Sequence, residues 1–222
     1  MTMSITNQQS PGSADSTSQV STRRQRVPAS ERRDALIEAA VHEFARGGLH
    51  GTPVDRIARR VGVAQPYVFS LFGSKRDLFL AAVERGFERI GETFTKAAAE
   101  FDPSIALPDT DVFTAMGQAY VDLLRSDRDY LMLQHQSYAA CDDDVVRERV
   151  RALYARLVAH VERLSEAEAE RIDEFFRYGM WLNVAAAMGV EDLSAGCEWV
   201  MAEGAEPDSS EAEGESHGTP SE

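Results

Sequence analysis

Apolar residues recur at steps of three and four along most of the chain, the spacing that places them on one face of a helix. The segment "SERRDALIEAAVHEFARGG" shows the pattern first, and its apolar face consists of Leu36, Ile37, Ala40, Val41 and Phe44. Ser30 is expected to cap this helix and Gly47-Gly48 to end it. The alternating pattern of strands is missing, so the sequence predicts an all-α fold.

A second, short helix is predicted in "TPVDRIARRVG", with Thr52 as its N-cap and Pro53 in its first turn. Its buried face is expected to consist of Val54, Ile57, Ala58 and Val61. Gly62 breaks the pattern, which leaves about eight residues, too few for an isolated helix to be stable in water. This helix must therefore pack on its neighbours.

A third helix is predicted in "AQPYVFSLFG", where Pro66 is tolerated because first-turn amides have no acceptor within the helix. Val68 and Phe72 are expected to face inward. The remaining large side chains are left on the sides or outside, and they are Gln65, Tyr67, Phe69 and Leu71. Gly73 ends this helix, and Ser74 is expected to cap the next.

The fourth helix is predicted to run from Lys75 to about residue 101, ending before "DPSIALPD". Ser165 and Glu168 have the spacing of a capping box at the start of a later helix. The remaining helices are predicted at about 111–126, 128–140, 143–163, 166–188 and 191–203. The total is about nine helices.

Charge is distributed unevenly along the 222 residues, whose net charge is −14. Residues 1–90 contain 13 Lys/Arg and 9 Asp/Glu, whereas residues 91–222 contain 10 and 28. A basic front on an acidic body is expected when only one end meets a polyanion. A chance excess of surface arginine gives the same pattern, so charge alone does not decide.

Several classes of protein are disfavoured by composition. No apolar run approaches the roughly 18 residues of a membrane span, and the N-terminus lacks an apolar signal core, so we expect a cytoplasmic protein. Cys141 and Cys197 are far apart and are expected to be free thiols. The aspartates of "CDDD", residues 141–144, are explained by helix capping. We therefore expect no enzyme, metal site or cofactor.

A helix, a glycine, a short helix and a new cap follow each other with the spacing of a helix-turn-helix. The segment from Leu36 to Phe79 resembles the DNA-binding domain of TetR-family transcriptional regulators over about 45 residues. The residues that carry the resemblance are Ala39, Ala40, Phe44, Gly48, Thr52, Ile57, Ala58, Gly62, Val63, Phe72, Ser74, Lys75 and Leu78. The later helices resemble the family's ligand-binding and dimerisation region in number and length.

The resemblance implies a set of DNA contacts. Gln65 is the candidate for an adenine edge, and Pro66 or the Tyr67 ring for a thymine methyl. Lys75, Arg76 and the free amides of the fourth helix are candidates for phosphate binding, although both cations also fit a solvated surface. The candidate DNA-binding residues are Thr52, Gln65, Pro66, Tyr67, Phe69, Ser74, Lys75 and Arg76.

Three positions depart from the family pattern. Ala64 stands where the family usually has Ser, so an N-cap of about 1 kcal/mol is missing. Phe69 stands in place of the usual Tyr and cannot donate to a phosphate, and Leu71 replaces the usual His. The arginines at 23, 24 and 26 end a polar segment and fit either a DNA-binding arm or an unbound tail.

The last two predicted helices resemble a dimerisation bundle, although an intramolecular core fits as well. The candidate dimer residues are Phe175, Phe176, Gly179, Leu182, Ala186, Leu193, Cys197 and Val200. A small organic effector is expected among the middle helices. Its candidate contacts are Met116, Tyr120, Met132, His135, Gln136, Tyr178 and Trp181, each of which also fits an ordinary core. Asn183 fits either the dimer register or an effector contact.

The resulting prediction has four parts. Residues 1–27 form a disordered arm with a basic end, 28–76 a helix-turn-helix domain, 77–203 an effector-binding and dimerisation domain, and 204–222 a disordered acidic tail. The resemblance implies a homodimeric regulator, released from palindromic double-stranded DNA by a largely apolar effector, with no membrane partner. An architectural DNA-binding dimer that ignores effectors is the alternative.

Overall fold

The computed structural model describes residues 28–108 and 110–190. These residues form eight helices and contain no strand, which confirms the predicted all-α fold. The helices are α1 (Ala29–Gly51), α2 (Val54–Val61), α3 (Gln65–Phe72), α4 (Lys75–Glu100), α5 (Val112–Ser126), α6 (Arg128–Ala139), α7 (Asp144–Ser165) and α8 (Ala169–Met188). The arm, the ninth predicted helix at 191–203 and the acidic tail lie outside the described residues.

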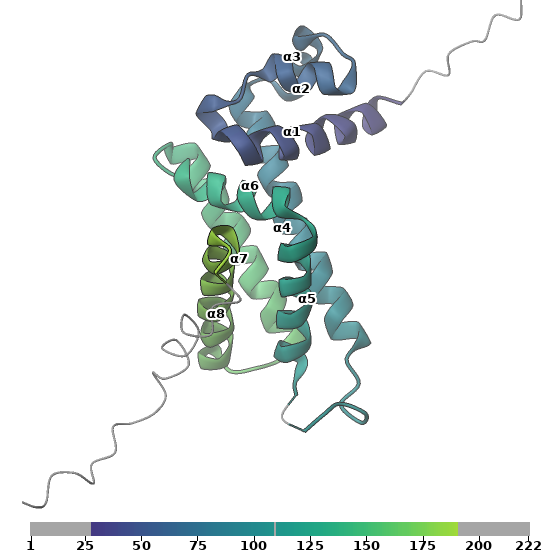
Figure 1. Ribbon diagram of the computed structural model, residues 1–222, viewed down its shortest axis with the longest axis vertical. Coiled ribbons are helices and arrows are strands. Elements are labelled where there is room, and N and C mark those ends of the chain that lie inside the picture. Colours follow the sequence, from purple (N-terminus) through teal and green to yellow (C-terminus); the bar gives the residue numbers. More distant parts are fainter. Residues whose placement is uncertain (1–27, 109, 191–222) are drawn as a thin grey trace, which may run out of the picture.

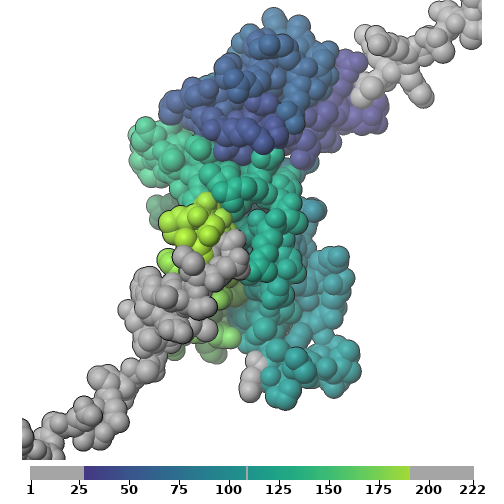
Figure 2. All heavy atoms as spheres, in the orientation of Figure 1, coloured from purple at the N-terminus to yellow at the C-terminus, as the bar shows by residue number. Residues whose placement is uncertain are grey.

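The first three helices form a head at one end of the molecule, and the later helices form an elongated body (Figure 1). α4 starts in the head and runs down into the body, where α5 and α7 lie along it and α8 packs on α5 and α7. α6 lies across the top of the body, directly beneath α1. The same division is visible in Figure 2, where the purple and blue head covers the green and teal body.

Glycines with positive φ set the breaks between the head helices. Gly48, at φ 62° and ψ −175°, interrupts α1 near its predicted end, and a final turn continues to Gly51. Gly62, at φ 73°, ends α2 by donating its amide to the carbonyls of Ala58 and Arg59. Both conformations are strained for residues with a Cβ, so the chain turns where glycine occurs.

Of the side-chain caps predicted for α1, α4 and α8, one is confirmed and two are wrong. Ser74 caps α4 as predicted, because its Oγ accepts the amide of Asp77 at 3.1 Å. The cap prediction at Ser30 is wrong, since α1 begins at Ala29 and places Ser30 inside the helix. The predicted capping box of α8 is also wrong. α7 continues to Ser165, whose hydroxyl donates to the carbonyl of Val161 at 2.9 Å, so it is not available to α8.

Aromatic rings connect the packed layers of the molecule. In the head, the ring of Phe44 meets Phe79 edge-on at 5.0 Å, which ties α1 to α4. In the body, the ring of Phe94 contacts Phe175 at 5.5 Å, and Phe175 contacts Phe113 at 5.3 Å. Fully burying one such side chain contributes about 1.5–3 kcal/mol. These contacts hold α4, α5 and α8 together.

Candidate functional site

The outer face of α3 is the part of the head best placed to meet a ligand. Val68 and Phe72 are buried beneath the helix, as predicted. Gln65, Pro66 and Phe69 are exposed, and Phe69 leaves 38% of its surface open, which is unusual for an aromatic side chain. α3 therefore presents a polar amide beside apolar groups, the combination that reads base edges and thymine methyls.

Tyr67 lies at the side of α3, which agrees with its predicted place on the sides or outside of the helix. Its ring is partly buried and packs against the hydrophobic core, so only part of the side chain faces outward. Leu71 is likewise partly buried. The most exposed part of α3 therefore centres on Gln65, Pro66 and Phe69.

Two cations stand at the N-terminus of α4, next to the exposed face of α3. Lys75 donates from Nζ to the backbone carbonyl of His50 at 3.0 Å, and partial burial lowers its pKa. Arg76 lies 3.0 Å from the carboxylate of Asp143 in the loop before α7. Each cation thus has a protein partner, from which a phosphate would have to draw it.

Thr52 corrects the expectation that it caps α2. The residue before α2 is Pro53, and Thr52 makes no side-chain cap. Its hydroxyl is buried and donates to the backbone carbonyl of Glu43 at 3.1 Å, with only 2% of the residue exposed. This burial argues against a phosphate contact by the hydroxyl, while a contact by the backbone amide of Thr52 stays a prediction.

Several cations in the head were missed by sequence reasoning. Arg56 and Arg60, on α2, lie 3.6 Å and 3.4 Å from the buried carboxylate of Glu43. Arg59 pairs with Asp55 at 2.6 Å, and all three arginines leave about half or more of their side chains exposed. The spacing of arginines in "DRIARR" was the available signal, because steps of one, three and four spread cations around the solvent face of a short helix.

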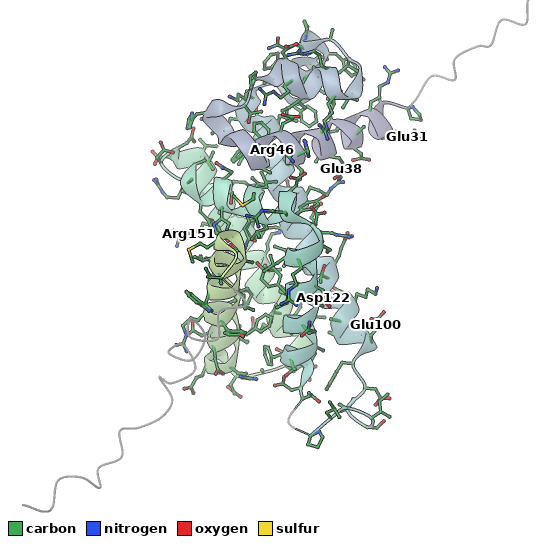
Figure 3. The ribbon with its side chains drawn as sticks, viewed as in Figure 1. Glu31, Glu38, Arg46, Glu100, Asp122 and Arg151 are labelled. Atoms are coloured by element: carbon green, nitrogen blue, oxygen red, sulfur yellow. The ribbon has the colours of Figure 1, made fainter. Side chains whose placement is uncertain are left out.

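α6 connects the head to the body. Its Asp129 carboxylate lies 2.6 Å from Nδ1 of His42 and 3.2 Å from Arg46, both on α1. Tyr130, the next residue of α6, donates its hydroxyl to Glu38 at 3.1 Å. Figure 3 labels Arg46 and Glu38 on the side of α1 that faces α6.

Gln136 extends this junction at the other end of α6. Its side-chain oxygen lies so close to Gly48 that a Cβ there would overlap it. The sequence analysis predicts that Gln136 contacts an effector, but the structure places its side chain against the break in α1. The α1–α6 junction, defined by His42, Arg46, Gly48, Asp129 and Gln136, therefore joins the head directly to the body.

Two narrow cavities lie below this junction. The upper cavity lies between α4, α5 and α6 and the lower cavity between α4, α5, α6, α7 and α8; their volumes of ≈ 380 Å³ and ≈ 460 Å³ include space that is open to solvent. Tyr120 and Gln134 line both, so these two side chains stand between them. Both spaces are tight enough that an organic ligand would require the lining side chains to move apart.

The cavities include only two of the seven predicted effector contacts, Tyr120 and Tyr178. Met116 is fully buried in the core, and Met132 packs against it without lining either cavity. His135 hydrogen-bonds to the carbonyl of Asn183 at 3.2 Å. Trp181 is partly buried and lines neither cavity. Gln134, missed by the sequence analysis, is the polar group that both cavities share.

The predicted dimer stripe of α8 faces its own subunit where the structure describes it. Phe175, Phe176, Gly179 and Leu182 line the lower cavity, and Ala186 is buried. The apolar residues that α8 leaves exposed are instead Tyr178, Val184 and Met188, open by 44%, 39% and 60%. The other three candidates, Leu193, Cys197 and Val200, lie outside the described residues.

Within residues 28–108 and 110–190, none of the helices combines the length and apolar character that crossing a membrane requires. No three His, Cys, Asp or Glu side chains in this part of the chain gather in a position to hold a metal ion.

Comparison with known proteins identifies the head. The sequence profile of the bacterial regulatory proteins of the tetR family matches residues 36–82, from within α1 into α4. The HTH-type transcriptional activator FasR of Mycolicibacterium smegmatis is 38% identical over 65 residues, or 29% of this chain and 30% of that protein. The HTH-type transcriptional repressor SCO4008 of Streptomyces coelicolor is 38% identical over 50 residues, or 22% and 26%.

The matched parts thus span less than a third of either curated relative. Along most of its length, the chain resembles solved structures in fold alone. A TetR-like transcriptional regulator from Rhodococcus sp. RHA1 has a TM-score of 0.58 and 22% identity, covering 80% of this chain and 95% of that one. All three proteins are described as transcriptional regulators, which agrees with the expectation that the chain is not an enzyme. Through the helix-turn-helix of its head, residues 36–82, the chain is similar to the tetR family of bacterial regulatory proteins.

Proposed function

We propose that the chain is a homodimeric transcriptional regulator that binds a palindromic operator through α3 and is released by a small, largely apolar effector. The observation that carries the proposal is the exposed face of α3 beside the cationic N-terminus of α4, in a segment that matches the tetR-family profile. The curated relatives include an activator and a repressor, so the match itself leaves the sign of regulation open. We favour repression because effector release then switches expression on.

DNA binding divides between two kinds of contact. Gln65, Pro66 and Phe69 are exposed on α3 and supply the base contacts, while Tyr67 supports them with the edge of its ring. Ser74 and Lys75 bring the first amides of α4 and a cation to one phosphate. Arg76 joins them when it leaves Asp143. Phosphate contacts set affinity and orientation, whereas base contacts set sequence preference.

Dimerisation follows from the geometry of operator recognition, because two recognition helices must lie about one helical turn of DNA, roughly 34 Å, apart. The apolar surface of α8 supports the proposal. Val184 and Met188 lie one turn apart on α8 and leave an exposed apolar surface without a cover among the described residues. A self-complementary apolar face is the usual basis of a two-fold dimer.

Effector control is proposed to pass through α6. Leu131, Leu133 and Gln134 on this helix line the cavities, while Asp129 and Gln136 contact α1. A ligand that widens the cavities therefore displaces the same helix that supports the head. A tightly packed junction has few alternative arrangements, so a small shift of α6 turns the head and changes the separation of the two α3 helices.

Selection of bound fragments from random duplex DNA tests the proposed function. We expect enrichment of a palindrome with half-sites about 10 base pairs apart, and two chains per bound duplex by native mass spectrometry. Failure to bind any duplex at low ionic strength would refute the proposal. A screen of metabolites by melting temperature then separates the two regulator classes, because an architectural dimer shows no shift with any apolar compound.

A further inference from the structure

Tyr120 and Gln134 line both interior cavities and form a polar wall between them, and Asn183 and Tyr138 are hydrogen-bonded to this wall. Asn183 donates from Nδ2 to the hydroxyl of Tyr120 at 3.0 Å and to Oε1 of Gln134 at 2.7 Å. Tyr120 donates to the same oxygen of Gln134 at 3.2 Å, and Gln134 donates to the hydroxyl of Tyr138 at 2.7 Å. These bonds order the wall between two otherwise apolar spaces.

One polar atom of these four side chains has no hydrogen-bond partner among the described residues. Asn183 has no exposed surface, and its Oδ1 has no hydrogen-bond partner among the described residues. An unpaired carbonyl that is cut off from water is costly, and native structures keep few of them. Its two partners, Tyr120 and Gln134, line both cavities, so a ligand that parts them reaches Asn183.

The charges around the cavities restrict the ligand further. Neither described lining contains a Lys or Arg, and the lower lining contains no acidic residue either. The one carboxylate of the upper lining, Asp127, caps α6 by accepting the amide of Tyr130 at 3.5 Å. A carboxylate or phosphate buried here would find no compensating cation. Burial also raises the pKa of Tyr120 and Tyr138, so both phenols stay neutral.

We infer that the two cavities join into one site for a neutral, mainly apolar molecule that carries a hydroxyl group, and that this hydroxyl donates to Oδ1 of Asn183. A hydroxyl both donates and accepts, so it satisfies the Asn183 amide in either rotation of that group. The inference rests on the proposed function, because it assigns the chemistry of the effector. It also supplies a partner for the one buried polar side-chain atom that lacks one within residues 28–108 and 110–190.

Isomeric probes test the inference without knowledge of the natural effector. 1-Octanol and 1-methoxyheptane contain the same atoms, but only the alcohol donates a hydrogen bond. Titration calorimetry with the full chain is expected to show about tenfold tighter binding of 1-octanol. Octanoate and octylammonium, which carry charges, are expected to bind more weakly than the alcohol. Equal binding of the two isomers, tighter binding of octanoate, or no binding of any probe would overturn the inference.

Variants of Asn183 test whether the hydroxyl group of the bound alcohol donates to this residue. Asn183→Leu removes the acceptor, and Tyr120 and Gln134 can still bond each other, so we expect the chain to fold and the two isomers to bind equally. Asn183→Ala should give the same result with less steric change. Leu124→Ala, at an apolar position of the upper lining, should weaken both isomers alike and preserve their ratio. A preference for the alcohol that survives in both Asn183 variants would contradict the assignment.

Operator binding is measured separately in the same samples. If 1-octanol binds through Asn183 but leaves operator affinity unchanged, the site stands and the proposed release mechanism fails. If the chain binds no operator at all, the proposed function fails whatever the probes do.

Discussion

The guanidinium of Arg76 lies 3.0 Å from the carboxylate of Asp143 and joins the first turn of α4 to the start of α7. The same carboxylate accepts the amides of Val145 and Val146 at 2.9 Å and 3.1 Å and so caps α7. The hydrogen bond from Arg76, and then that from Val146, hold the pKa of Asp143 below its usual value. In the proposed DNA complex, this anion of the body would therefore compete with a DNA phosphate for a cation of the head.

Asp143→Asn is expected to tighten DNA binding. Asn keeps the cap of α7 but removes the charge, which leaves Arg76 available to a phosphate. The logarithm of affinity should then fall more steeply with the logarithm of salt concentration, by about 0.9 for one added phosphate contact. Fluorescence anisotropy of a labelled duplex at several salt concentrations measures this slope. Asp144→Asn, which removes the neighbouring charge paired with Arg147, serves as the control and should leave the slope unchanged.

Lys75→Gln should weaken binding to every duplex, since a phosphate contact carries no sequence information. The salt slope is expected to become shallower by about 0.9. The matched control is Lys96→Gln, at the far end of α4, where the cation is exposed beside Glu100. A Lys75 variant that changed sequence preference but kept the salt slope would speak against a phosphate role.

Thr52→Val separates a structural from a DNA-binding role for this threonine. Valine fills the same space but cannot donate to the buried carbonyl of Glu43, so the free energy of unfolding should fall by about 1–2 kcal/mol. The salt slope of DNA binding should not change, because the hydroxyl is buried. Thr52→Ser retains the donor and should recover most of the stability. Chemical denaturation and anisotropy together decide, and a shallower slope with unchanged stability would restore the phosphate contact.

Local patterns predicted the helices well because helix-forming stripes and glycine breaks act over a few residues. α2 and α3 occur where Gly62 and Gly73 confine them, and α5 to α8 agree with their predicted ranges within a few residues. Caps were harder to predict, since a hydroxyl has several possible partners. Thr52 bonds to a carbonyl nine residues earlier, which no local rule anticipates.

The inner face of the body was harder to predict for a different reason. Small and aromatic residues at helical spacing suit a dimer seam and a subunit core equally well, and Phe175 and Leu182 are partly buried and pack against the core of their own subunit. Gln134 and Asn183, 49 positions apart in the sequence, meet only because α6 crosses α8. Single-residue chemistry identified Asn183 as unusual, but only the packing showed that one of its atoms lacks a partner.

Gly48→Ala should destabilise the α1–α6 junction. The backbone at φ 62° and ψ −175° belongs almost only to glycine, and such a conformation costs other residues about 1–3 kcal/mol. The new Cβ would also meet the side chain of Gln136, so Gln136→Ala in the same chain should recover part of the loss. Gly51→Ala is the control, because its Cβ would meet no atom and the residue does not have positive φ. Urea denaturation measures the stability of the unsubstituted chain, the two single glycine variants and the double variant. Equal stability of the two single glycine variants would contradict this account.

Met188→Glu tests the proposed dimer face. Met188 is 60% exposed near the end of α8, and a charge there would be buried without a partner if two copies of α8 meet. The variant is expected to sediment as a monomer and to lose at least about tenfold in operator affinity, because a single α3 reads only half of a palindrome. Val145→Glu, at a 48% exposed apolar position of α7 near the head, should remain dimeric. Sedimentation velocity distinguishes the cases, and a dimeric Met188→Glu chain with full operator affinity would place the interface elsewhere.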